Sequence, residues 1–246
     1  VAETGANVTK FAVGDRVFGY NEGPFGTHAE FVAVRADGPV AALPDQVSFA
    51  SGAAGTEGSH YALAFLRVTG LGAGDDVLVF GATGAIGSAA VQLLKHAGAT
   101  VTAVCDTANV EKVGGLGADR VVDYTATDFT ADDQRYDAVL DAVGKSTFGR
   151  CKRLLKDRGA YSSSELGPWA QNLVLPLVTL PMRQRVRFPY PTQDQAMIEH
   201  LGRLLASGEL TPLIDRHYPL TEIVAAYEYV ETGRKVGNVV IDVVPT

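Results

Sequence analysis

The segment from Gly81 to Gly87 reads Gly-Ala-Thr-Gly-Ala-Ile-Gly and is the first place where residue types and spacing could do chemistry. Glycines at a sharp turn let the backbone approach a pyrophosphate, because no Cβ stands in the way. Free N–H groups at the start of a following helix, with the helix dipole, then favour the phosphate charge. The pattern predicts a dinucleotide site; the alternative is an ordinary glycine-rich turn. The expected lining residues are Gly81, Thr83, Gly84, Ala85, Ile86 and Gly87.

Asp106 stands nineteen residues beyond Gly87, at the end of the next predicted strand. A Rossmann fold places at this point the group that contacts the adenosine ribose, and a carboxylate there accepts hydrogen bonds from both ribose hydroxyls. Asp106 is therefore predicted to bind the ribose. The alternative is that it caps the turn or the helix near Asn109.

The elements that must position these residues form a βαβαβ pattern. Residues 77–80 are a continuous apolar run, typical of a strand buried on both faces. Residues 86–97 carry their apolar side chains on one helical stripe. Strands that alternate with helices predict an α/β fold with a parallel, doubly wound Rossmann sheet. Further strands are predicted at 100–105, 120–122, 136–141 and 159–162, with helices at 109–116 and 148–156.

The regions before and after this βαβαβ pattern have different sequence patterns. Short alternating runs at 16–20 and 29–34 lie between glycine and proline turns, and they predict part of a β-barrel. Residues 167–191 contain five prolines and are expected to form a loop-and-strand excursion. The remaining elements are predicted as helices at 194–206 and 221–232 and a strand at 238–243.

Composition excludes several classes of protein. The 28 acidic and 21 basic residues give a formal charge of −7, which argues against a nucleic-acid partner. Two cysteines, Cys105 and Cys151, cannot build a disulfide framework or a cysteine-rich zinc site. No apolar run approaches the roughly 18 to 20 residues that span a bilayer, and residues 1–10 lack a signal-peptide pattern. A cytoplasmic protein without a membrane partner is expected.

Taken together, these residues resemble the medium-chain dehydrogenase/reductase family, in its zinc-independent quinone-oxidoreductase-like branch. The resemblance implies a GroES-like barrel built from both chain ends, here 1–52 and 192–246, with the Rossmann domain 53–191 inserted. It also implies a hydride transfer between a nicotinamide cofactor and a small carbonyl, enone, quinone or alcohol. The motifs that carry the resemblance are residues 13–19, 26–31, 77–87, 116–124, 214–220 and 237–241.

Three departures from the family pattern matter. The family's barrel begins before the residues that match Val1, so a partial substrate domain is expected, whether by fragmentation, processing or loss. The four-cysteine zinc lobe is missing, and Ala54 or a neighbour stands where a zinc-ligating cysteine would be, so no zinc is expected. Asp106, Thr107 and Ala108 replace a Ser-Thr-Arg of NADPH-using relatives, which favours NAD(H). NADP(H) stays open, because Lys112 and Tyr124 could contact a phosphate.

Catalysis without zinc needs a hydrogen-bond donor to polarise the substrate oxygen. His60 and Tyr61, in the helix expected near the nicotinamide, are the candidates. The alternative is that His60 caps a helix and Tyr61 packs in a domain interface. The resemblance also implies that Val143, Gly144 and Ser162 line the ribose of the nicotinamide.

Two rival functions are weighed. A short-chain dehydrogenase needs a tyrosine four residues before a lysine, and none of the nine tyrosines has this spacing. A non-catalytic dinucleotide-binding protein, such as a sensor or assembly partner, remains the alternative to an enzyme because half of the substrate domain is expected to be absent. A small-molecule substrate is the expected partner, with a homodimer possible through the edge at residues 183–188.

Overall fold

The computed structural model describes residues 1–21, 26–192 and 194–243 and divides the chain into two compact units. Unit 1 is made of Val1–Glu57 and Thr192–Thr246, and unit 2 is Gly58–Pro191. The two candidate phosphate and ribose contacts, Gly81–Gly87 and Asp106, both lie in unit 2.

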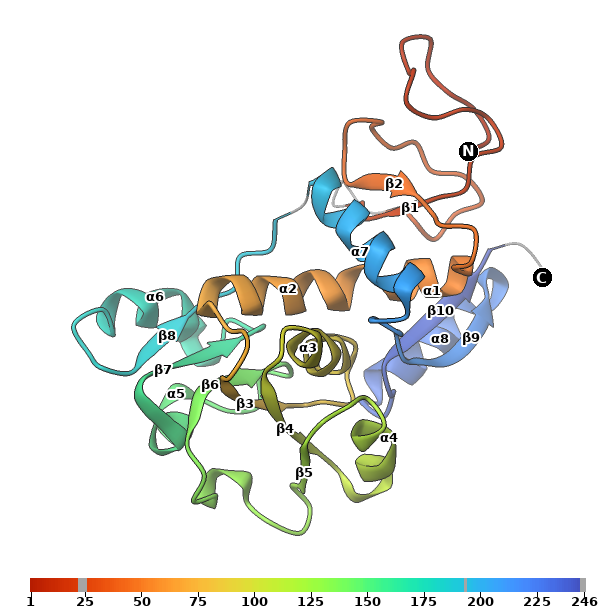
Figure 1. The fold of residues 1–246 in the computed structure, drawn as a ribbon. Helices are drawn as coiled ribbons and strands as arrows, with labels where there is room; N and C mark the ends of the chain where they lie inside the picture. The colour runs from red at the N-terminus through yellow and green to blue at the C-terminus, as the bar shows by residue number, and fades with distance from the viewer. Residues whose placement is uncertain (22–25, 193, 244–246) are drawn as a thin grey trace. The chain divides into compact units, whose positions relative to one another are not determined.

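Unit 2 is built around a parallel sheet of six strands in the order β5-β4-β3-β6-β7-β8 (Figure 1). The reversal of strand order beside β3 is the point where a doubly wound sheet opens a crevice for ligands at its carboxyl edge. The prediction of a Rossmann fold is confirmed. The strands are β3 Asp76–Phe80, β4 Thr100–Cys105, β5 Arg120–Asp123, β6 Tyr136–Asp141, β7 Leu155–Ser163 and β8 Arg185–Arg187.

The helices of this unit follow the apolar stripes of the sequence with two differences. The helix expected at 148–156 ends early, because β7 begins at Leu155 to pair with Tyr136 of β6. The segment 167–191 contains the strand β8 and also a helix, α6, which was not expected because of the five prolines. The helices are α2 Glu57–Thr69, α3 Ala85–His96, α4 Val110–Gly114, α5 Phe148–Cys151 and α6 Gln171–Val178.

Unit 1 contains two small sheets. β1 Val17–Gly19 pairs antiparallel with β2 Val40–Ala42, and β9 Ile214–Pro219 pairs parallel with β10 Asn238–Asp242. The strand expected at 29–34 is not formed. A strand needs a hydrogen-bonded neighbour, and within the described residues this segment has none, which leaves Phe31 76% exposed. The helices of unit 1 are α1 Phe49–Ala54, α7 Gln195–Ser207 and α8 Ile223–Glu231.

No helix in the part of the chain that the structure describes is long and apolar enough to cross a membrane.

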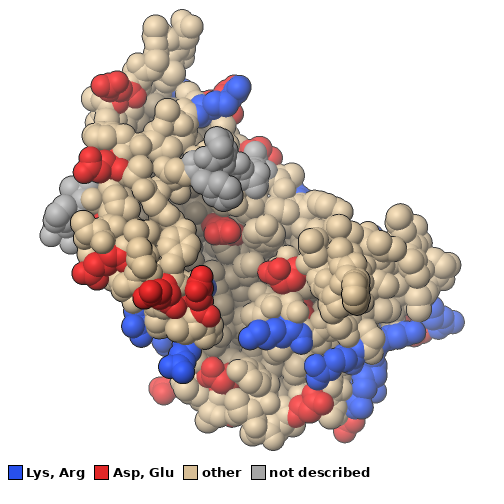
Figure 2. Space-filling view, turned by 180° about the vertical axis from the view of Figure 1, so that it is seen from behind, with Lys and Arg blue, Asp and Glu red and all other residues tan. Residues whose placement is uncertain are grey.

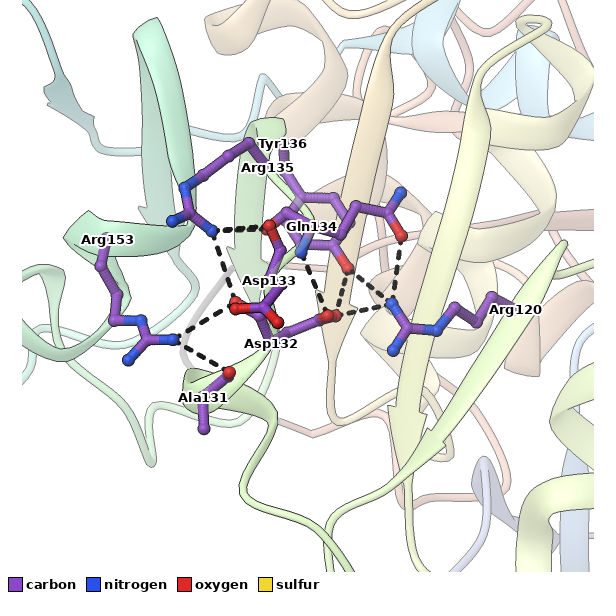
Figure 3. Close-up of polar contacts among 8 residues, drawn as sticks. All are labelled: Arg120, Ala131, Asp132, Asp133, Gln134, Arg135, Tyr136 and Arg153. Atoms are coloured by element: carbon purple, nitrogen blue, oxygen red, sulfur yellow. Dashed lines mark hydrogen bonds and ion pairs between the residues drawn. The ribbon is translucent and has the colours of Figure 1, made fainter.

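A charged network lies at the amino ends of β5 and β6 (Figure 3). The glycine-rich segment follows the carboxyl end of β3, at the opposite edge of this parallel sheet. Arg120 Nη1 lies 2.6 Å from Asp132 Oδ2, and the Tyr136 hydroxyl donates to the same oxygen at 2.8 Å. Burial alone would raise the pKa of Asp132, but the hydrogen bonds from Arg120, Tyr136 and the Gln134 N–H outweigh it and hold that pKa below its usual value. The network therefore connects the amino ends of two strands and lies away from the carboxyl edge of the sheet, where ligands bind.

Asp132→Asn should lower the free energy of unfolding by about 2 kcal/mol at pH 7, because hydrogen bonds to a charged acceptor are among the stronger ones. Because the pKa of Asp132 is lower in the folded state, its carboxylate stabilises the fold at pH values above its unfolded pKa of about 4. This contribution is lost as the pH falls through the folded pKa. The difference from wild type should therefore shrink near pH 2. Urea unfolding at both pH values measures it. Asp133→Asn, at an exposed neighbour, is the control; equal effects of the two substitutions would contradict the prediction.

Candidate functional site

Two glycines of the Gly81–Gly87 segment are required by the backbone itself. Gly81 directly follows β3 and has φ +82°, and a Cβ there would lie 2.5 Å from Cγ1 of Val143. A Cβ on Gly87 would overlap the carbonyl oxygen of Gly81 and lie 2.8 Å from its carbonyl carbon. These contacts bring β3, the following turn and α3 closer together than any side chain allows, which is the role of the first and last glycines in a dinucleotide loop.

Gly84 is different, because it leaves space open. It is the N-cap of α3, with φ −72°, and a Cβ would meet only the Gly81 oxygen at 3.5 Å. Its own N–H donates to that oxygen at 3.1 Å, which closes the turn. No side chain caps α3. Among the described residues, the first N–H groups of this twelve-residue helix thus meet no side-chain acceptor, as an anion site at a helix start requires. The other predicted residues of the loop, Thr83, Ala85 and Ile86, are half-buried around this start.

Asp106 directly follows β4, at the same edge of the sheet. Its Oδ1 accepts a hydrogen bond from Asn109 Nδ2 at 2.7 Å, so the contact with the Asn109 turn is real. No described residue donates to its Oδ2, which therefore stays available to a ribose hydroxyl. The two interpretations of Asp106 are compatible, because a carboxylate accepts from several donors.

Thr107, Lys112 and Tyr124 lie around Asp106 with different surroundings. Thr107 donates to Asp123 Oδ2 at 2.6 Å, and the hydrogen bonds from Thr107 and Thr125 hold the pKa of Asp123 below its usual value. Lys112 is exposed on α4. Tyr124 is 49% exposed, borders a hollow of about 350 Å³ and meets the Phe80 ring edge-on at 6.4 Å.

Asp141, at the end of β6, is a functional candidate that the sequence analysis missed. It is fully buried, and its carboxylate accepts four hydrogen bonds. Oδ1 accepts from the N–H groups of Val143 and Gly144 at 3.1 and 2.8 Å. Oδ2 accepts from the Ser146 N–H at 2.8 Å and the Tyr161 hydroxyl at 3.0 Å. The carboxylate therefore shapes the loop that holds two of the predicted cofactor residues. An acidic residue ending an apolar strand just before a glycine was the available signal.

Polar atoms at and near the carboxyl end of β7 are buried without a hydrogen-bond partner among the described residues. Ser162 is fully buried, and its Oγ has no hydrogen-bond partner among the described residues. The same holds for Ser164 Oγ and for Oδ1 of Asn172, a residue of α6 that is 2% exposed. Buried polar groups are nearly always paired, with protein, ligand or ordered water, so a polar ligand or a water is the expected partner of these atoms. The prediction had named only Ser162 here.

His60 and Tyr61 lie in the first turns of α2, which packs on the start of α3. A Cβ on Gly58 would lie 2.6 Å from the carbonyl oxygen of Ala85, so the two helices touch there. His60 is 2% exposed, whereas Tyr61 is half-buried, and their ring centroids are 5.1 Å apart. Of the two, Tyr61 has the greater access to a bound molecule.

The side chains of residues 1–21, 26–192 and 194–243 form no cluster of three or more His, Cys, Asp or Glu that could hold a metal ion. Cys105 and Cys151 are both buried free thiols, and burial raises the pKa of each to about 11.

Comparison with known proteins places this geometry among dehydrogenases. Residues 116–241 match the family model described as zinc-binding dehydrogenase. The chain is 33% identical to 2-methylene-furan-3-one reductase of Solanum lycopersicum and 29% identical to the chloroplastic NADPH-dependent alkenal/one oxidoreductase of Arabidopsis thaliana. Both matches cover 100% of this chain and 62% of the relative, so the chain spans less than two thirds of these proteins.

A solved structure, the quinone oxidoreductase from Coxiella burnetii, superposes with a TM-score of 0.88 at 28% identity. The superposition covers 98% of this chain and 76% of the other.

Proposed function

The chain belongs to the zinc-binding dehydrogenase family, as a quinone-oxidoreductase-like medium-chain dehydrogenase/reductase, and we propose that it serves a zinc-independent hydride transfer. The substrate would be a small carbonyl, enone or quinone, and the reaction partner a nicotinamide dinucleotide. The open helix start at Gly84, framed by Gly81 and Gly87, carries the proposal. The names of the relatives, which act on an alkenal or enone and on a furanone, support this substrate class.

Each candidate residue has a task under this proposal. When bound, the nicotinamide supplies or accepts the hydride. The N–H groups of Ala85 and Ile86 would bind the pyrophosphate, and Asp106 would accept from the adenosine ribose. Val143, Gly144 and Ser162 would hold the ribose of the nicotinamide, which would give Ser162 Oγ a hydrogen-bond partner.

Tyr61 is proposed as the donor to the substrate oxygen, with His60 buried beside it as the second predicted residue. The reaction is proposed to run without zinc, because Ala54 or a neighbour stands where the resemblance places a zinc-ligating cysteine.

Tyr61→Phe should lower kcat by about 100-fold, because removing one donor to a developing oxyanion costs this much in other enzymes. The Kd for NADH should not change. Turnover of a panel of quinones, enones and aldehydes, with the fluorescence of bound NADH, measures both quantities. Tyr227→Phe removes an exposed hydroxyl outside unit 2 and is the control. An unchanged kcat would remove Tyr61 from the mechanism, and NADH binding without any turnover by the full-length protein would favour the non-catalytic alternative.

NAD(H) is proposed as the preferred cofactor, with NADP(H) as the alternative. The Asp106 carboxylate repels a 2′-phosphate, while Lys112 and Tyr124 stand nearby and the Arabidopsis relative is named as NADPH-dependent. Asp106→Ser should raise the affinity for NADPH relative to NADH by about 10-fold, since it removes one unit of like charge near the phosphate. Titration with both nucleotides checks this. A wild-type protein that already prefers NADPH would refute the role of Asp106.

Several coarser features complete the proposal. Unit 1 would be the partial GroES-like substrate domain and unit 2 the cofactor domain. Two buried free cysteines support a reducing compartment, which includes the cytoplasm. A homodimer would cover the apolar face of α6, which exposes Leu173, Val174, Leu177 and Val178 beside the edge strand β8. Sedimentation of the purified chain measures that assembly.

A further inference from the structure

Four arginines surround a hollow of about 640 Å³ at the edge of the sheet of unit 2. Arg158 comes from the first part of β7, Arg183 precedes β8, and Arg185 and Arg187 belong to β8. Figure 2 views the molecule from behind and shows blue Lys and Arg side chains along the lower right of this face. The strand β8, at the left of Figure 1, lies on the right in this reversed view. The hollow shares no lining residue with the candidate cofactor site.

The charge of this hollow is not balanced. Asp157 is the one acidic residue among the described residues that line it, and it forms an ion pair with Arg183. Among the described residues, no carboxylate lies within ion-pair distance of Arg158, Arg185 or Arg187. Three positive charges therefore converge on one hollow in a chain whose net charge is −7. Such a local field concentrates anions.

The backbone of β8 places the charges of Arg185 and Arg187 close together, although they repel each other. Val186 points to the buried face of β8, so Arg185 and Arg187 share the opposite face, at about 7 Å spacing along the strand. Like charges in this arrangement repel unless an anion bridges them.

Arg158 adds strain to this repulsion. It adopts φ +69°, a region that favours glycine, although Gly159 stands next to it. A non-glycine residue kept in this region costs stability, and such outliers cluster where side chains bind ligands.

We propose that the four arginines bind a small anion with two or more phosphate groups, at a site separate from that of the dinucleotide. Guanidinium groups donate pairs of parallel hydrogen bonds to phosphate oxygens, and several phosphates can engage several forks at once. An edge strand also gains from charged side chains, because they discourage pairing with another chain. That protection would explain Arg185 and Arg187 without any ligand, but it gives no reason for the strained Arg158.

The test is calorimetric titration of the whole chain with pyrophosphate and with tripolyphosphate, at constant ionic strength, with and without saturating NADH. With saturating NADH, which occupies the dinucleotide site, we expect one site with a Kd below about 1 mM, which corresponds to roughly −4 kcal/mol. The same site should keep its Kd without NADH, where the empty dinucleotide site adds a second one. The double variant Arg185→Gln/Arg187→Gln should weaken the binding at least 10-fold and leave the Kd for NADH unchanged.

Two further variants distinguish an anion-binding site from charges that only keep the edge strand β8 from pairing with another chain. Arg35→Gln/Arg234→Gln removes the same charge from exposed positions of unit 1 and should not weaken the binding. Arg158→Gly should raise the unfolding midpoint, because it relieves the positive φ, and yet weaken pyrophosphate binding. Absence of binding, competition by NADH, or an equal loss in the two double variants would overturn the proposal.

Discussion

Gly87→Ala should lower the stability of the protein by about 3 kcal/mol, the upper end of the cost of overpacking, and should weaken NADH binding by about 1,000-fold. The added Cβ would overlap the carbonyl oxygen of Gly81, which is backbone and cannot rotate away. The only escape is to move α3 from β3, which opens the turn that presents the N–H groups of the helix. Urea unfolding and titration with NADH measure the two effects.

Gly84→Ala is the matched control for this prediction. Its Cβ would have 3.5 Å to the Gly81 oxygen and an ordinary φ of −72°, so the fold should lose less than about 1 kcal/mol. NADH affinity should still fall, by about 10- to 100-fold, because the methyl group would stand where the pyrophosphate approaches α3. Wild-type NADH affinity in Gly84→Ala would mean that the phosphates bind elsewhere.

The sequence predicted the strand, turn and helix around Gly81–Gly87 well, for a physical reason. Local signals determine it: a buried apolar strand, glycines at fixed spacing and an amphipathic helix lie within twenty-five residues of each other. Each of these patterns expresses a backbone requirement that only certain residues meet. The prediction therefore depended little on the rest of the chain.

Elements determined by contacts distant in sequence were predicted less well. In α6, Pro176 lies inside an eight-residue helix that follows left-handed conformations at Trp169 and Ala170, and no propensity anticipates either feature. Residues 29–34 have the alternation of a strand, but alternation describes the faces of a strand and not its partner. The extension of β7 back to Leu155 likewise follows from its pairing with β6.

Asp141 belongs to the same group, because its importance comes from atoms that only the fold brings together. Tyr161 is twenty residues away in sequence, yet its hydroxyl donates to Asp141 Oδ2. Burial, together with the charge of Asp141, raises the pKa of Tyr161, so the hydroxyl keeps its proton. A reader of the sequence sees an acidic residue at the end of a strand and cannot see its four donors.

Asp141→Ala should lower the free energy of unfolding by about 4 kcal/mol, since it leaves buried donors without an acceptor. Asp141→Asn keeps one acceptor oxygen but turns an NH₂ group toward two donors, so about half of this loss is expected. Tyr161→Phe removes one donor and no acceptor, and about 1 kcal/mol should be lost. Urea unfolding of the three variants tests this order.

NADH titration of the same variants shows whether the carboxylate also serves the cofactor. Val143 and Gly144 owe their backbone positions to Asp141 Oδ1, an acceptor that Tyr161→Phe leaves intact. NADH affinity should therefore fall at least 10-fold in Asp141→Asn, if its amide turns Nδ2 toward this loop, and stay near wild type in Tyr161→Phe. Should affinity fall equally in both variants, the effect would follow from core stability alone, and the loop after β6 would have no specific part in holding the nicotinamide ribose.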